Sequence, residues 1–339
     1  TEADTTLSVH DLKVHFPIST GFLIRRQTGA VKAVDGVSFD IAPGETLGLV
    51  GESGSGKTTT GRAILQLQRP TSGSVQFRGV ELTAVSAKQM RPFRSEMQII
   101  FQDPYSSLNP RMPVMDLISE PLRARGWSRA DCKTRVTELM EQVGLDPRTI
   151  RRYPHAFSGG QRQRIGIARA LALSPSLIVA DEPVSALDVS VQAQILNLLR
   201  DLQRDLGLTL VFIAHDLSVV RYLCDQGAVM YMGRIVEQGE SEVLFTAPRH
   251  PYTATLLHAS PSPDPHAAWM DEIDEVETTA VPPMATSQVE RRGCAFAPRC
   301  AHATQLCRQQ EPVLEAQDDG SHLTSCHHQR ELQLTGVSS

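Results

Sequence analysis

The chain has 339 residues, 41% of them hydrophobic, which is enough for one large or two ordinary domains with complete cores. Its 38 acidic and 33 basic side chains give a formal net charge of −5, which leaves no basic footprint for binding nucleic acid. No apolar run approaches the roughly 18 residues that span a membrane, and the first residues show no signal sequence. Any membrane role is therefore expected to come through a partner protein.

Short β-rich runs alternate with helical stretches, which indicates an α/β domain with a largely parallel sheet. The runs are residues 31–41, 45–50, 96–101, 176–181 and 208–215. Between about 103 and 160 the sequence becomes charged and helix-periodic, which predicts a helical insertion. We assign residues 1–260 to a nucleotide-binding domain, residues 261–290 to an acidic, proline-rich linker, and residues 291–339 to a small cysteine-rich module.

A loop rich in glycine and serine, GESGSGKT at residues 51–58, follows the β-rich run that ends at residue 50. Such a loop exposes backbone N–H groups, and the helix N-terminus behind it favours an anion. The spacing fits the phosphate-binding P-loop, whose lysine reaches the outer phosphates and whose hydroxyl binds Mg²⁺. The alternative is a flexible turn. The predicted nucleotide ligands are Gly51, Ser53, Gly54, Ser55, Gly56, Lys57, Thr58 and Thr59, with Thr58 also on Mg²⁺.

A second helix start carries an N-cap serine and two glycines, in the order Ser158, Gly159, Gly160, Gln161. A helix N-terminus of this kind also favours an anion. One nucleotide does not need two separate glycine-rich helix starts. We therefore predict that this segment grips a nucleotide held by another subunit, the alternative being an ordinary helix start.

Polar side chains follow two of the predicted strands. Asp181 is the last residue of the run 176–181 and Glu182 follows it, and His215 ends the run 208–215. Strand ends are where a doubly wound sheet presents its ligand groups. Asp181 is predicted to hold Mg²⁺ through water, and Glu182 to polarise the water that attacks the γ-phosphate. His215 is predicted to contact the γ-phosphate and to orient Glu182, the alternative being a structural histidine.

These motifs, in their order along the chain, resemble the nucleotide-binding subunit of an ABC transporter over about residues 7–260. The motifs are residues 51–58, Gln102, residues 158–161, Asp181-Glu182, residues 185–188 and His215. The chain departs from the pattern at Phe157, an apolar packing position where many members have leucine. The resemblance implies a P-loop NTPase fold of the ABC ATPase type, with a helical subdomain at about residues 103–160. It also implies hydrolysis of ATP with Mg²⁺ at sites between two subunits.

The resemblance implies further roles for single residues. Gln102 is expected to sense the γ-phosphate and Mg²⁺, and to couple them to the insertion through the segment that holds Tyr105 and Leu108. Asp188 is expected at the dimer interface, where it contributes with residues 158–161 to a nucleotide bound in trans. An aromatic ring ahead of the first core strand is expected to stack on adenine, with Phe16 as the candidate and Phe22 as the alternative.

Stretches outside the catalytic set are similar to the ATPase subunits of bacterial dipeptide and oligopeptide importers. They are FQDPYSSLNPR, RYPHAFSGGQRQRI, EPVSALDVSVQAQILNLL, HDLSVV, PRHPYT and the cysteine-bearing GCAFAPRC. This similarity implies an ATP-hydrolysing subunit that powers peptide uptake, peripheral on the cytoplasmic face of the bacterial inner membrane. The implied partners are two membrane permease subunits, a second, paralogous ABC ATPase and an extracytoplasmic substrate-binding protein, with no nucleic acid.

Other functions share this core. Related importers carry nickel, glutathione or sugars, and these substrates remain alternatives. Soluble ABC ATPases of translation carry two cores in one chain, whereas one motif set occurs here, and those of DNA repair carry inserted zinc modules. These soluble classes therefore fit the sequence less well.

Four clustered cysteines, Cys294, Cys300, Cys307 and Cys326, allow a disulfide pair, a zinc site or an iron–sulfur site. An ATPase that uses cytosolic ATP is expected in a reducing compartment, which argues against disulfides. Zinc sites usually have more closely spaced cysteine pairs. Four thiolates suit a [4Fe–4S] cluster, and the resemblance to peptide-importer subunits with such a cluster favours it, with Zn²⁺ as the alternative.

Overall fold

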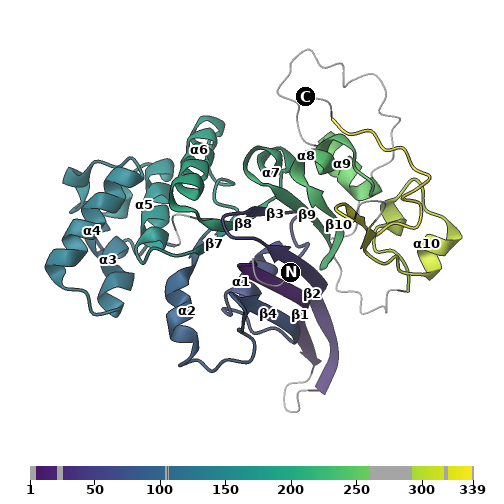
Figure 1. The fold of residues 1–339 in the computed structure, drawn as a ribbon, viewed down its shortest axis with the longest axis horizontal. Coiled ribbons are helices and arrows are strands. Elements are labelled where there is room, and N and C mark those ends of the chain that lie inside the picture. The colour runs from purple at the N-terminus through teal and green to yellow at the C-terminus, as the bar shows by residue number, and fades with distance from the viewer. Residues whose placement is uncertain are drawn as a thin grey trace.

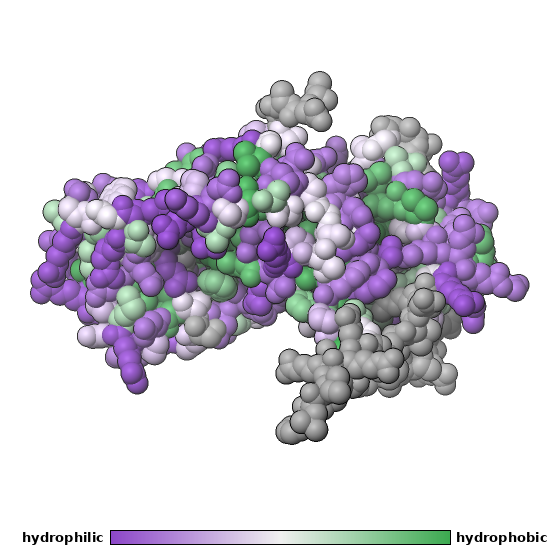
Figure 2. Space-filling view, turned by 90° about the horizontal axis from the view of Figure 1, so that it is seen from below, coloured by the Kyte–Doolittle hydropathy of each residue, from purple (hydrophilic) through white to green (hydrophobic). Residues whose placement is uncertain are grey.

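The structure is a computed structural model that describes residues 5–20, 26–103, 105, 107–259, 292–316 and 320–337 (Figure 1). Phe22 and the predicted linker 261–290 lie outside the described residues. Within the described ranges, no helix is both long enough and apolar enough to cross a membrane. On the face drawn in Figure 2, hydrophilic residues cover most of the surface, with smaller hydrophobic patches between them.

The larger sheet has the strand order β11-β12-β10-β9-β3-β8-β7-β6. Neighbouring strands from β6 to β9 run parallel, as the continuous apolar runs predict. These strands are β3 (Thr46–Val50), β6 (Met97–Ile100), β7 (Leu177–Asp181), β8 (Thr209–Ala214) and β9 (Gln226–Tyr231). The other three, all antiparallel to their neighbours, are β10 (Arg234–Glu240), β11 (Glu315–Ala316) and β12 (Leu323–Thr324).

A smaller antiparallel sheet has the order β2-β1-β4-β5. Its strands are β1 (Leu7–Thr20), β2 (Arg26–Ile41), β4 (Ser72–Phe77) and β5 (Val80–Glu81). Helix α1 (Lys57–Ile64) packs between this sheet and the parallel strands, and Figure 1 shows it there. The phosphate loop lies between β3 and α1 and is therefore anchored at the junction of the two sheets.

The central strands are buried on both faces because alternate residues enter two different cores. In β8, Leu210 and Phe212 pack in one core, whereas Val211 and Ile213 pack in the other. The first core also holds α5, α6 and the helical insertion, and the second holds α1 and the smaller sheet. A central strand fixed on both faces gives the polar residues at its end a defined position.

Most of the remaining helices flank the larger sheet. Figure 1 shows α3, α4 and α5 together on one side of the molecule, and α9 and α10 on the other. The helices are α2 (Met90–Glu96), α3 (Val114–Ala124), α4 (Arg129–Gln142), α5 (Gly159–Leu171), α6 (Val189–Leu206), α7 (Leu217–Leu223), α8 (Ser241–Thr246), α9 (Pro251–Ala259) and α10 (Gln305–Gln309). Short 3₁₀ turns occupy η2 (Pro147–Thr149), η3 (Pro154–Ala156) and η4 (Ala297–Arg299).

The cysteine-bearing segment, residues 292–337, is built onto the ATPase core. Strand β12 pairs with β10 and extends the larger sheet, and Phe296 lies 3% exposed in the first hydrophobic core. Glu237 of β10 is fully buried and pairs with His322 over 2.7 Å. This segment, which the sequence predicts to be a small module, therefore shares part of its packing with the core of the larger domain.

Candidate active site

The phosphate loop needs glycine at two positions. Gly51 and Gly56 have φ angles of 155° and 107°. A Cβ atom on Gly51 would lie 2.2 Å from the Met230 carbonyl oxygen, and one on Gly56 would lie 2.3 Å from that of Ala33. Neither approach is possible with a side chain. The loop is thus held closely between β9 and β2.

Lys57 begins α1 and is only 4% exposed. Its ammonium group donates to the carbonyl oxygens of Gly51 and Glu52 over 2.6 and 3.0 Å, and lies 3.8 Å from Glu182 Oε1. Burial lowers the pKa of Lys57, while the charges of Glu182, Asp181 and Glu52 oppose that shift. In the same loop, Ser55 Oγ is buried without a hydrogen-bond partner. The loop therefore carries donors that fit a phosphate.

Thr58 and Asp181 meet across the sheet edge. Thr58 Oγ1 donates to Asp181 Oδ1 over 2.7 Å, and Asp181 is 3% exposed. Burial raises the pKa of Asp181, and the hydrogen bond from Thr58 opposes that shift. A hydroxyl and a carboxylate oxygen at this separation are the hard oxygen donors that Mg²⁺ prefers.

Glu182 and Gln102 lie at the ends of neighbouring strands, β7 and β6. Gln102 Nε2 donates to Glu182 Oε2 over 2.8 Å. Glu182 adopts φ 46°, a left-handed conformation that is uncommon outside glycine and that occurs often at functional sites. The structure thus brings the predicted carboxylate, amide and lysine into one cluster.

His215 follows β8 at the same edge of the sheet, because Ile213 is the register partner of Asp181. Its side chain is exposed, and no hydrogen bond joins it to Glu182 in the described part of the chain. Phe16 is 39% exposed on β1 and is paired in register with Val31. Val31 is two residues from Ala33, whose backbone carbonyl oxygen lies close to Gly56 of the phosphate loop.

The segment 158–161 opens α5 with a capping box. The Ser158 hydroxyl accepts a hydrogen bond from the Gln161 N–H, and the Gln161 side chain accepts one from the Ser158 N–H. Gly160 packs against Val191 of α6, whose N-cap is the exposed Asp188. Among the described contacts, none joins this segment to the chain's own phosphate loop.

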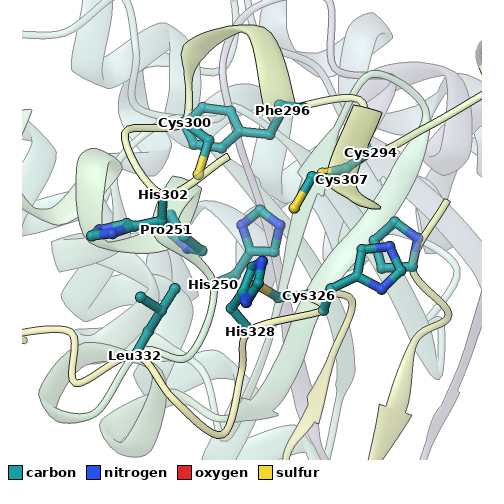
Figure 3. A pocket seen from close by; sticks show the side chains of 13 residues that line it. His250, Pro251, Cys294, Phe296, Cys300, His302, Cys307, Cys326, His328 and Leu332 are labelled. Carbon is teal, nitrogen blue, oxygen red and sulfur yellow. The ribbon is translucent and has the colours of Figure 1, made fainter. Parts of the chain in front are cut away.

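The four clustered cysteines line one pocket of about 20 Å³, together with histidines that include His250 and His328 (Figure 3). All four are free thiols. Burial raises the pKa of Cys326 to about 11. Within the described residues, no three His, Cys, Asp or Glu side chains are arranged to hold a single metal ion.

Two contacts reach the phosphate loop from the C-terminal part of the chain, and no sequence pattern predicted them. Arg299 forms a bidentate ion pair with Glu52, the residue after Gly51, over 2.8 and 2.9 Å. The Tyr252 hydroxyl accepts a hydrogen bond from the Glu52 N–H over 2.9 Å. Arg299 lies 247 positions from its partner, so neither local periodicity nor a motif could have revealed the pair.

Comparison with known proteins gives two family matches. The ABC transporter family matches residues 34–185, and the oligopeptide/dipeptide transporter C-terminal region matches residues 236–307. The oligopeptide transport ATP-binding protein OppF of Salmonella typhimurium is 49% identical over 323 residues, which cover 94% of this chain and 95% of OppF. AppF of Bacillus subtilis, also named an oligopeptide transport ATP-binding protein, is 45% identical over 330 residues, 96% of this chain and 97% of AppF.

Two solved structures with a similar fold are an ABC transporter component and an ATP-binding cassette. CbiO1 from Clostridium perfringens, part of the CbiONQ transporter complex, has a TM-score of 0.62 and 27% identity, covering 71% of this chain and 91% of CbiO1. The ATP-binding cassette MJ0796, solved as a dimer with ADP and phosphate, has a TM-score of 0.62 and 26% identity, covering 69% of this chain and 98% of MJ0796. The predicted α/β ABC ATPase fold and the resemblance to peptide-importer subunits are confirmed. The chain belongs to the ATP-binding proteins of oligopeptide/dipeptide ABC transporters, and it is an ABC-type ATPase.

Proposed function

We propose that the chain is the ATP-hydrolysing subunit of an importer of di- and oligopeptides, peripheral on the cytoplasmic face of a bacterial inner membrane. The observation that carries the ATPase part is the cluster of Lys57, Gln102 and Glu182 beside the Thr58–Asp181 pair. The peptide substrate comes from the printed names of OppF and AppF. Nickel, glutathione or sugar import by the same ATPase core is the alternative.

In the proposed mechanism, the loop residues 51–59 hold the triphosphate, with Lys57 on the outer phosphates. Thr58 and Asp181, with Gln102, would hold Mg²⁺, which supplies charge neutralisation on the phosphates when bound. Glu182 accepts the proton of the water whose oxygen attacks the γ-phosphorus, and the bond to the bridging oxygen breaks so that ADP leaves. His215 orients that water, and Phe16 stacks on adenine.

Two copies of such a site form between two ATPase subunits. Residues 158–161 and Asp188 would bind the nucleotide held by the partner. This role is supported by the exposure of Ser158 and Gln161 at the start of α5 and of Asp188 at the start of α6. The partner would be a paralogous ABC ATPase.

The helical insertion, about residues 103–160, is proposed to be the surface that docks on the membrane permease, which has two subunits. A substrate-binding protein delivers the substrate to the permease from outside. Exposed aromatic side chains support this surface. Tyr105 is 59% exposed, with the Arg162 guanidinium 4.1 Å from its ring centroid, and Tyr153 is 44% exposed. Tyrosine, which has an apolar ring and a polar hydroxyl group, is enriched at protein interfaces.

We further propose that residues 291–339 form a cysteine-rich module around a [4Fe–4S] cluster, reached from the nucleotide-binding domain (residues 1–260) through a linker at 261–290. The donor set supports it, because Cys294, Cys300, Cys307 and Cys326 line one largely apolar pocket. A [4Fe–4S] cluster takes four thiolate ligands, the number that this pocket offers. Zn²⁺ remains the alternative.

Fractionation tests the transporter assignment. The chain is expected in the membrane pellet when its permease subunits are co-expressed, and in the supernatant when they are not. A chain that stays in the supernatant with all subunits present would favour a soluble ABC ATPase. ATP hydrolysis by the co-purified complex, assayed with Glu182→Gln as the inactive variant, tests the enzymatic part separately.

A further inference from the structure

An arginine of the cysteine-bearing segment, Arg299, contacts the phosphate loop, although it belongs to none of the ATPase motifs. Arg299 Nη1 and Nη2 donate to the two carboxylate oxygens of Glu52 over 2.8 and 2.9 Å. Glu52 is the second residue of the phosphate loop, and Arg299 directly precedes Cys300. Paired, parallel hydrogen bonds of this kind fix the carboxylate in direction as well as in distance.

Aromatic rings fix Arg299 in place. Its guanidinium carbon lies 5.7 Å from the ring centroid of Phe296 and 6.0 Å from that of Tyr231. Phe296 in turn packs 5.4 Å from both Tyr231 and Tyr252, and it is almost fully buried. A guanidinium restrained by aromatic faces loses little further entropy when it pairs with a carboxylate.

The charge of Glu52 bears on phosphate binding. A carboxylate in a loop that receives a triphosphate repels it unless the negative charge is neutralised. The Lys57 ammonium group donates to the backbone carbonyl oxygen of Glu52 over 3.0 Å. Burial lowers the pKa of Lys57, and the negative charge of Glu52 is among those that oppose that shift. Without Arg299, the Glu52 carboxylate would be an unpaired negative charge in the loop that receives the phosphates.

We propose that Arg299 is a positioning residue of the ATP site, which neutralises and orients Glu52 and thereby sets the affinity of the phosphate loop for nucleotide. The proposal rests on the proposed ATP site but needs no metal in the cysteine pocket. It makes the cysteine-bearing segment part of the nucleotide-binding machinery, so that a change in that segment next to Cys300 alters nucleotide affinity.

The test is direct titration of the full chain with a slowly hydrolysed ATP analogue and Mg²⁺. Arg299→Gln should raise Kd about three- to fivefold, at the upper end of the range for partly exposed charge pairs. Arg299→Lys, which keeps the positive charge, should have a Kd between those of Arg299→Gln and the parental chain. The double variant Glu52→Gln with Arg299→Gln should return to within about twofold of the parental Kd, because no unpaired carboxylate remains.

A matched control lies between α7 and α8. Arg221 also forms a bidentate pair, with Glu242 over 2.7 and 2.8 Å, and also packs over an aromatic ring, that of Phe245. Arg221→Gln should leave Kd unchanged. An Arg299→Gln chain with parental Kd, or a double variant as weak as Arg299→Gln alone, would overturn the proposal.

Lys57→Ala separates this inference from the ATP site itself. It should weaken analogue binding strongly, because a neutral stub cannot replace the charge on the outer phosphates. If Lys57→Ala weakens binding and Arg299→Gln does not, only the role of Arg299 fails. If Lys57→Ala leaves Kd unchanged, the assignment of the phosphate loop fails.

Discussion

Gln102 and Glu182 are joined by a 2.8 Å hydrogen bond between Nε2 and Oε2, although 80 positions separate them in the chain. The bond follows from the sheet, since β6 and β7 are parallel neighbours with Ile100 paired to Ala180. Lys57 lies on the other side of the carboxylate, 3.8 Å from Oε1. The strand ends therefore place one carboxylate between an amide and an ammonium group, where the γ-phosphate of ATP is proposed to bind.

Glu182→Gln should leave ATP binding near the parental level and lower turnover by about 10²- to 10⁴-fold, because the amide keeps the shape but cannot accept a proton. Steady-state hydrolysis and direct nucleotide titration on the purified complex measure the two effects separately. The partner ATPase site is disabled in both samples. Glu242→Gln, which changes an exposed carboxylate on α8, is the matched control and should hydrolyse ATP at the parental rate. Near-parental turnover in Glu182→Gln would contradict the proposed role of Glu182 as the acceptor of the water proton.

Tyr105 and Leu108 should respond differently to substitution, although they are three residues apart. Tyr105→Ala should lower substrate-stimulated hydrolysis by the assembled transporter while sparing the basal activity of the isolated chain, because its exposed ring belongs to the proposed docking surface. Leu108 is 2% exposed in the first core, so Leu108→Ala should lower the free energy of unfolding by about 2–5 kcal/mol. Loss of basal activity in a Tyr105→Ala chain of parental stability would contradict the docking role.

The sequence predicted the features that residues close together in the chain determine. These are the phosphate loop, the carboxylates at the end of β7 and the parallel strands. It did not distinguish Tyr105 from Leu108, because a loop has no periodicity that shows which side chain faces the core. Strands β11 and β12 have two residues each and left no pattern. The pairing of Arg299 with Glu52 depends on the packing of Phe296 among aromatic rings, which only the folded chain reveals.

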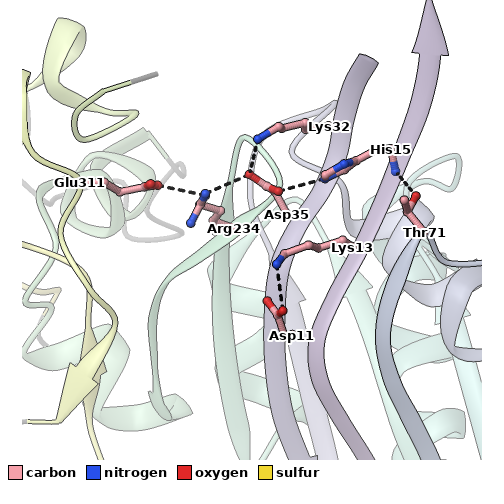
Figure 4. A network of polar contacts seen from close by, with 8 residues as sticks. All are labelled: Asp11, Lys13, His15, Lys32, Asp35, Thr71, Arg234 and Glu311. Atoms are coloured by element: carbon pink, nitrogen blue, oxygen red, sulfur yellow. Dashed lines mark hydrogen bonds and ion pairs between the residues drawn. The ribbon is translucent and has the colours of Figure 1, made fainter. Parts of the chain in front are cut away.

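Asp35 should make a pH-dependent contribution to stability. It pairs with Arg234 and His15 at 2.9 Å each and with Lys32 at 3.4 Å, and Arg234 extends the network to Glu311 at 3.0 Å (Figure 4). Burial alone would raise the pKa of Asp35, but its positively charged neighbours together hold it below its usual value.

Asp35→Asn should therefore lower the free energy of unfolding by about 1–3 kcal/mol at neutral pH. A depressed carboxylate pKa contributes stability above the unfolded-state pKa, and that contribution disappears as pH falls through the folded-state pKa. The difference between parental and Asp35→Asn chains should thus stay constant above about pH 5 and shrink below about pH 4. Denaturant titrations at several pH values measure it, with the exposed Asp40→Asn as control. A difference that grows on acidification would refute this account.

Cys294→Ser should abolish the proposed cluster. Anaerobically purified parental chain is expected to be brown and to hold roughly four irons, because four thiolates ligate one cubane. Metal analysis and the visible absorption spectrum measure this. Cys132→Ala changes a buried thiol in the helical insertion and should keep the iron. Colourless parental protein with one zinc, after iron-replete expression, would replace the cluster with a zinc site.

The most direct test of the central claim is ATP-driven uptake of a labelled oligopeptide into proteoliposomes. These carry the permease subunits, the partner ATPase and this chain, with the binding protein outside and ATP sealed inside. The account predicts peptide accumulation with the parental chain and none with Glu182→Gln, while labelled Ni²⁺, glutathione and sugar stay outside. Accumulation of one of those other substrates instead of the peptide, or equal peptide uptake with Glu182→Gln, would contradict the proposed function.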